Sequence, residues 1–110
     1  MIRTLSGQER LKMVFGWFDA RAAKKCGAEL ARAFASRVPA QANIGERKFE
    51  SRAKSAIAQL QRDAAEFARS EKLNAYKKAQ LGNAFKWALK DAGYADEYVD
   101  KLTDLLLLQL

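Results

Sequence analysis

The side chains that could perform covalent or acid–base chemistry are few in this sequence. It contains one cysteine, Cys26, and no histidine. A Cys–His pair, a Ser–His–Asp triad and the usual zinc or iron ligand sets all require residues that are missing here. The sequence also has no Walker A loop, no glycine-rich dinucleotide turn and no Asp-rich calcium loop. This composition favours a non-catalytic protein with no cofactor and no metal.

Carboxylate pairs are the remaining candidates for acid–base catalysis. Glu46 and Glu50, and likewise Asp63 and Glu66, are spaced so that each pair shares a helix surface. Both pairs stand among arginines, which is typical of a solvated helix face. Catalysis has to be argued from a site, and these pairs show nothing beyond that pattern. We predict that the protein is not an enzyme.

The thiol of Cys26 falls on an apolar stripe between Ala22 and Leu30. A cysteine in such a position acts as a small apolar side chain. Lys24 and Lys25 could lower the pKa of the thiol, but at helical spacing they point away from the stripe. We expect a buried structural thiol, and a single cysteine excludes an intrachain disulfide.

A basic and aromatic surface is the first candidate binding site. Between Lys72 and Lys90 the chain carries five lysines and no acidic residue. Wound at about 100° per residue, this segment puts its leucines and Phe85 on one helix face and Lys72, Lys86 and Lys90 opposite. Flat aromatic side chains beside lysines suit a nucleobase or a partner protein. The alternative is that Trp87 only packs against a neighbouring helix. The residues of this candidate patch are Tyr76, Asn83, Lys86, Trp87 and Lys90.

Positive charge is concentrated in the first 90 residues. The net charge is +7; residues 1–90 hold 19 basic and 8 acidic residues (+11), and residues 91–110 hold one basic and five acidic residues (−4). A basic surface gives sequence-independent affinity for phosphates, so binding of RNA or single-stranded nucleic acid is an alternative function for the patch. The turn at Gly93 has the rhythm of a helix-turn-helix. We reject DNA recognition by that unit, because Asp96, Glu97 and Asp100 would face the phosphates.

A run of leucines near residue 110 is the second candidate binding site. Leucines at 105, 106, 107, 108 and 110 cover nearly every direction around a helix, which is more apolar surface than one bundle buries. The acidic stretch of one copy would sit near the basic face of another and set its orientation. The alternative is a helix that only closes the core. We predict a homodimer formed through Leu105, Leu107, Leu108 and Leu110.

Targeting signals are not apparent in the sequence. The first residues lack the continuous apolar segment of a signal peptide, and no run approaches the roughly 18 apolar residues that a membrane span needs. We expect a cytoplasmic protein without a membrane span. Its expected partners are itself, another protein or nucleic acid.

The elements that must position both candidate sites are helices. Strong helix formers dominate the composition, β-branched residues are scarce, and apolar residues recur at three- and four-residue steps. We predict an all-α, single-domain bundle of four to five helices with short loops, spanning residues 1–110. The expected helices cover residues 7–38 with a possible break near 16–19, then 44–70, 73–92 and 96–109.

Capping signals and apolar stripes complete the expected fold. Gly93 should supply the left-handed residue after the third of these segments. The candidate N-caps are Asp19, Asn43, Ser70 or Asn74, and Asp96. The predicted core residues are Leu11, Phe15, Phe18, Ala22, Cys26, Leu30, Phe34 and Val38; Phe49, Ala53, Ile57, Leu60, Ala64 and Phe67; Leu73, Leu81, Ala84, Phe85, Ala88, Leu89 and Ala92; and Val99, Leu102, Leu105, Leu106 and Gln109.

Overall fold

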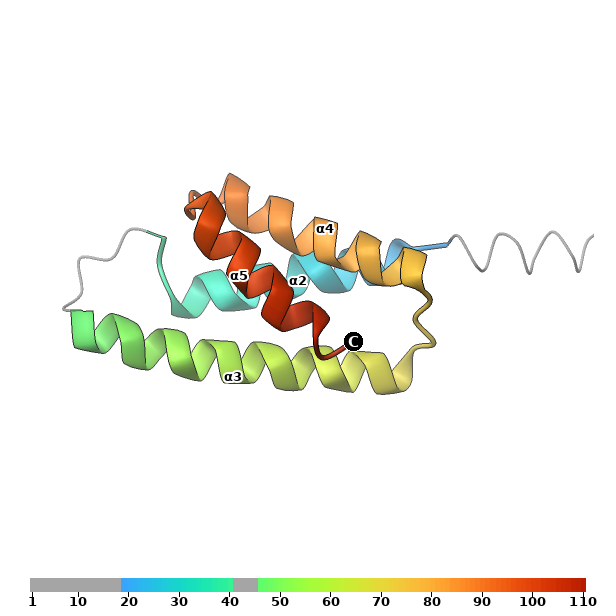
Figure 1. Ribbon diagram of the computed structural model, residues 1–110, viewed down its shortest axis with the longest axis horizontal. Coiled ribbons are helices and arrows are strands. Elements are labelled where there is room, and N and C mark those ends of the chain that lie inside the picture. The colour runs from blue at the N-terminus through green and yellow to red at the C-terminus, as the bar shows by residue number, and fades with distance from the viewer. Residues whose placement is uncertain (1–18, 41–45) are drawn as a thin grey trace, which may run out of the picture.

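The computed structural model describes residues 19–40 and 46–110. Within these ranges the chain forms four α-helices and no strand: α2 (Arg21–Arg37), α3 (Glu46–Ser70), α4 (Ala75–Asp91) and α5 (Asp96–Leu107), as Figure 1 shows. The all-α expectation is confirmed. The predictions for residues 7–18 and for the Asn43 cap lie outside the described residues, as does the side chain of Phe49.

The four helices pack in a ring. α2 packs against α3 and α4, and α5 packs against the same two helices. In Figure 1, α3 runs along one side, α4 along the opposite side, and α5 crosses in front of α2 between them. The contact between α2 and α4 is the most extensive of the four. Each helix therefore buries two flanks and keeps an outward face.

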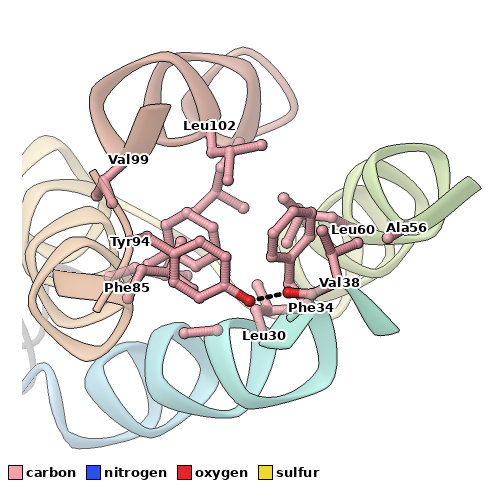
Figure 2. Close-up of a cluster of buried hydrophobic side chains, with 14 of the residues drawn as sticks. Leu30, Phe34, Val38, Ala56, Leu60, Phe85, Tyr94, Val99 and Leu102 are labelled. Atoms are coloured by element: carbon pink, nitrogen blue, oxygen red, sulfur yellow. Dashed lines mark hydrogen bonds between the residues drawn. The ribbon is translucent and has the colours of Figure 1, made fainter. Parts of the chain in front are cut away.

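One hydrophobic core fills the centre of this ring (Figure 2). α4 and α5 contribute large side chains with no exposed surface, such as Phe85 and Leu106. α2 contributes Leu30 and Phe34, and α3 contributes Leu60 and the smaller Ala56 and Ala64. The buried apolar residues are Ala20, Ala23, Leu30, Ala31, Phe34, Val38, Ala53, Ala56, Leu60, Ala64, Leu81, Phe85, Leu89, Tyr94, Val99, Leu102 and Leu106.

The predicted stripe on α2 is wrong at one position and incomplete at others. Ala22 is exposed, Cys26 is half-buried, and Ala23 and Gly27 are buried instead. The cause is the close crossing of α2 and α4, which turns the buried arc of α2 toward Gly27. A Cβ built at Gly27 would overlap the carbonyl oxygen of Leu81, so only glycine fits this crossing.

Other predicted core positions sit at the edge of the arc. Ala92 is exposed, and the remaining members are only partly covered because each helix meets two neighbours at an angle. The partly covered members are Ile57, Phe67, Leu73, Ala84, Ala88, Leu105 and Gln109.

Helix ends are set by caps, and two of the predicted caps are confirmed. The Asn74 side chain accepts a hydrogen bond of 2.8 Å from the backbone N–H of Lys77 at the start of α4. After α4, Gly93 takes φ 96°, its N–H donates to Lys90 O, and the N–H of Tyr94 donates to Leu89 O. This pair of bonds is a Schellman motif, and it turns the chain sharply into α5.

Asp19 and Asp96 are not N-caps. The N-cap positions of α2 and α5 are Ala20 and Ala95, with no side-chain cap bond. Asp19 instead binds the guanidinium of Arg21 at 2.7 Å and also accepts its backbone N–H. Asp96 is the first residue of α5, where a carboxylate favours the positive end of the helix dipole.

An aromatic cluster joins the end of α2 to the turn before α5. The Tyr94 hydroxyl donates a hydrogen bond to the carbonyl oxygen of Val38, drawn as a dashed line in Figure 2. The rings of Phe34 and Tyr94 are 5.9 Å apart between centroids, and those of Tyr94 and Tyr98 are 6.2 Å apart. This cluster holds the α4–α5 pair against α2.

Candidate functional site

The two aromatic residues of the candidate patch on α4, Tyr76 and Trp87, lie in different environments. Trp87 is 61% exposed, and Asn83, about one turn before it, is exposed as well. Tyr76, in the first turn of α4, is half-buried and packs against the hydrophobic core. The structure therefore keeps Trp87 and Asn83 at the surface and assigns Tyr76 to packing.

The lysines of the same patch bind carboxylates of α5. Lys86 Nζ lies 3.1 Å from Asp100 Oδ1, and Lys90 Nζ lies 3.7 Å from Asp96 Oδ1. Lys90 Nζ also lies 5.4 Å from the centroid of the Trp87 ring, within cation–π range. Because Asp96 and Asp100 are well exposed, each pair contributes at most about 1 kcal/mol. Part of the charge match that the sequence suggested between two copies is thus made within one chain.

The leucines near residue 110 divide into buried and exposed members. Leu106 is fully buried, and Leu105 and Leu110 are half-buried. Leu107 is 39% exposed and Leu108 is 76% exposed. The structure therefore does not enclose this segment, and its most exposed apolar side chain is Leu108.

Leu107 is partly engaged with α4. A Cβ built at Gly82 would lie 3.1 Å from Leu107 Cδ2, so the leucine side chain lies over the glycine. Leu108 projects from the next position and belongs to a different side of the helix. Among these leucines, Leu108 is therefore the best position at which to test for an intermolecular contact, because it is the most exposed.

The outward face of α5 is a row of exposed side chains that ends at Leu108. Glu97, Lys101 and Asp104 precede it at three- and four-residue steps and are all exposed. Asp104 and Glu97 form no salt bridge with any residue of the described ranges. The end of α5 therefore presents an apolar tip, formed by Leu108 and the partly exposed Leu107, on the same helix as the unpaired carboxylates Glu97 and Asp104.

An open hollow lies between the outward flank of α3 and the end of α5. Its volume is about 520 Å³. Its lining combines two alanines with two glutamines and with charged side chains of both signs. Its lining residues are Ala58, Gln61, Arg62, Ala65, Glu66, Arg69 and Gln109.

Sequence reasoning missed this hollow, although the sequence carries a signal for it. Ala58, Gln61, Ala65 and Ala68 follow the three- and four-residue spacing of a helix seam on the flank beside the core stripe. The predicted core stripe of this helix did not include these residues, because alanines next to arginines carry no strong apolar signal.

Two further depressions lie on the described part of the molecule. A cavity between α2 and α3 measures about 10 Å³, which is room for one water molecule. A hollow of about 420 Å³ lies where α2 begins and α3 ends, lined by charges of both signs. Among them, Asp19 is bound by Arg21, whose hydrogen bonds lower the pKa of the carboxyl group to about 2.

The Cys26 thiol is not activated. Burial, followed by the nearby carboxylates Glu29 and Asp63, raises its pKa to about 11. The thiolate, which is the nucleophilic form, is therefore scarce at neutral pH. Lys24 and Lys25 do not lower the pKa of the thiol, in agreement with their predicted direction.

Clustered metal ligands and long apolar helices are two further features that could indicate a function. In residues 19–40 and 46–110, no three or more Cys, Asp or Glu side chains are placed to hold a metal ion. Within the same ranges, no helix is both long and apolar enough to cross a membrane.

Together these features define an all-helical bundle with a basic, aromatic face on α4 and an apolar tip on α5. Comparison of the chain with protein-family models, curated proteins and solved structures finds no match. Its function must therefore be argued from its own surface.

Proposed function

We propose that the protein is a non-catalytic interaction module of the cytoplasm that pairs with a second copy of itself through the end of α5. The observation that carries this proposal is the 76% exposure of Leu108, beside a partly exposed Leu107. Large apolar side chains gathered at one end of a charged helix are typical of interaction surfaces.

The expected strength of the contact follows from its size. Burying one leucine side chain is worth about 1.5–3 kcal/mol, so two copies of Leu108 supply a few kcal/mol. Association also costs rigid-body freedom, which is of similar or larger size. The contact must therefore include more surface than Leu108 alone, and the dimer should be weak, with a Kd on the order of 10 μM.

Leu108→Glu is expected to abolish this dimer, because two carboxylates would replace the apolar contact. The measurement is sedimentation equilibrium from about 1 to about 500 μM, a range that brackets weak association. The wild type should approach twice its 12.3 kDa mass at the upper end, and the variant should remain at 12.3 kDa.

Trp87→Glu is the matched control for this experiment. It also replaces an exposed apolar side chain with a carboxylate, but on α4. If α5 is the seam, the Trp87 variant dimerises like the wild type. A wild-type mass of 12.3 kDa at every concentration would refute the proposal.

Binding of single-stranded nucleic acid through α4 is the second candidate function. It is favoured by the exposed Trp87 ring with Lys90 beside it, since an open aromatic face and a neighbouring cation suit base stacking and phosphate binding. It is weakened by the ion pairs of Lys86 and Lys90 with α5, which leave less positive charge for phosphates. For that reason we place it second.

If α4 binds nucleic acid, Trp87→Ala should weaken the affinity about tenfold, because one stacked base contributes about 1–3 kcal/mol. The measurement is fluorescence anisotropy of a labelled oligonucleotide of about 20 nucleotides at two salt concentrations. Leu108→Ala serves as the control and should leave the affinity unchanged. Equal affinities for wild type and Trp87→Ala would exclude α4 as the binding surface.

A further inference from the structure

The hollow between α3 and α5 and the apolar tip of α5 are neighbours on one surface. Gln109 lines the hollow, and Leu108 is the residue before it. Figure 1 shows the C-terminal end of α5 reaching α3, the helix that supplies the other lining residues of the hollow. A projecting side chain and a depression are therefore placed side by side.

Such a pairing of tip and hollow is what a two-fold dimer requires. In a two-fold interface the same patch is used by both copies, so the patch must be complementary to itself. A tip beside a hollow meets this condition, because rotation by 180° brings each tip over the hollow of the other copy. Two tips meeting head to head would instead leave both hollows empty.

The shape of the hollow suits an apolar side chain. Ala58 and Ala65 are seven residues apart on α3, and each lines the hollow with no more than a methyl group. The hollow is open to solvent, and its volume of about 520 Å³ exceeds that of a leucine side chain. Small residues on a helix flank allow a second helix to approach closely.

The hollow carries a net positive charge, from Arg62 and Arg69 against Glu66, and the outward row of α5 carries a net negative charge, from Glu97 and Asp104 against Lys101. Arg62 and Arg69 stand at the hollow, and neither forms a salt bridge with a residue of the described ranges. Arg62 donates one hydrogen bond, of 2.8 Å, to Gln59 Oε1 of its own helix. On the outward row of α5, Asp104 stands one turn before Leu108 and is also unpaired among the described residues. Placing Leu108 in the hollow brings Asp104 close to these guanidinium groups.

From these observations we infer that the partner of this protein is a second copy that inserts Leu108 into the hollow between α3 and α5, reciprocally about a two-fold axis. Asp104 of each copy faces Arg62 and Arg69 of the other. This inference rests on the self-association proposed above and names the surface that receives the α5 tip. The carboxylate–guanidinium contacts set the orientation, and the leucine supplies the apolar contact.

Charge reversal on the two sides of the interface tests this arrangement. One variant carries Asp104→Arg, and the other carries Arg62→Glu together with Arg69→Glu. Each variant alone places like charges across both halves of its homodimer, so its Kd should rise about tenfold or more. An equimolar mixture restores opposite charges in both halves, so the mixed dimer should regain the wild-type Kd.

Sedimentation of the two variants, alone and mixed, separates the possible failures. A monomeric wild type would refute the proposed self-association itself. A wild-type dimer that the α3 variant leaves intact, or a mixture that gains nothing over either variant, would overturn the insertion model and leave the α5 tip as the seam. Recovery in the mixture alone supports the inference. Circular dichroism of each variant confirms that its helices are retained.

A steric variant gives an independent readout. Ala65→Trp fills the hollow and should weaken the wild-type dimer about tenfold or more, and this effect does not depend on charge. Ser55→Trp is the matched control, because Ser55 is exposed on the same helix but does not line the hollow. Equal dimerisation of both tryptophan variants would overturn the inference.

Discussion

Gly27→Ala is expected to lower the free energy of unfolding by about 3 kcal/mol. The new methyl group would overlap the carbonyl oxygen of Leu81 and lie 3.1 Å from Ala84 Cβ, so α2 and α4 must move apart. Overpacking of this kind costs about 1–3 kcal/mol and more when the obstacle is backbone. The gain in helix propensity on replacing glycine, about 1 kcal/mol, offsets only part of that cost.

Urea unfolding followed by circular dichroism measures this change, with Gly82→Ala as the matched control. Gly82 is also a buried helical glycine, but its new Cβ would meet only the flexible side chain of Leu107, at 3.1 Å. We expect the control to stay within about 1 kcal/mol of the wild type. A Gly27→Ala protein as stable as the control would contradict the close crossing of α2 and α4.

Tyr94→Ala is expected to cost about 3–5 kcal/mol. The side chain is buried, its ring packs between Phe34 and Tyr98, and its hydroxyl binds the carbonyl oxygen of Val38. Removal of a buried aromatic side chain leaves a cavity that the surrounding helices fill only in part. The loss should loosen the α4–α5 pair from α2, so the variant should also show reduced near-ultraviolet circular dichroism.

Two phenylalanine variants separate the ring from the hydroxyl group. Tyr94→Phe removes the hydrogen bond to Val38 and should cost about 1 kcal/mol. Tyr98→Phe is the control, because the buried Tyr98 hydroxyl has no hydrogen-bond partner among the residues that the structure describes. Its removal should cost nothing or be slightly stabilising. Equal losses for both variants in thermal melts would contradict this assignment.

The two ion pairs between α4 and α5 reduce the net positive charge on the exposed face of α4. Asp100 and Asp96 of α5 bind Lys86 and Lys90 of α4. These ion pairs leave less positive charge on α4 for the phosphates of a nucleic acid. The later part of α5 is left with Asp104 and Leu108 exposed. This arrangement favours a contact made by the end of α5 over one made by the face of α4.

The sequence determined the helical class and the exclusion of common catalytic sites. Periodic apolar residues predict helices because the 3.6-residue repeat must align one face with the core. The missing histidine and the single cysteine exclude sites that require a histidine or more than one cysteine, whatever the fold. The helix caps at Asn74 and Gly93 could also be predicted from the sequence, because one residue and its immediate neighbours decide the geometry there.

Only the tertiary structure decided which exposed residues act together. The glycine crossing at Gly27 rotates the buried arc of α2, which no periodicity on a single helix reveals. The ring arrangement brings α5 across α4, so lysines of one helix meet carboxylates of the next. It also brings Gln109 to the flank of α3, where Gln109 and Ala65 line the same hollow. The physical reason is that the apolar residues of a helix show how much surface it must bury. Which flank of the helix is buried depends on helices that are far away in the sequence.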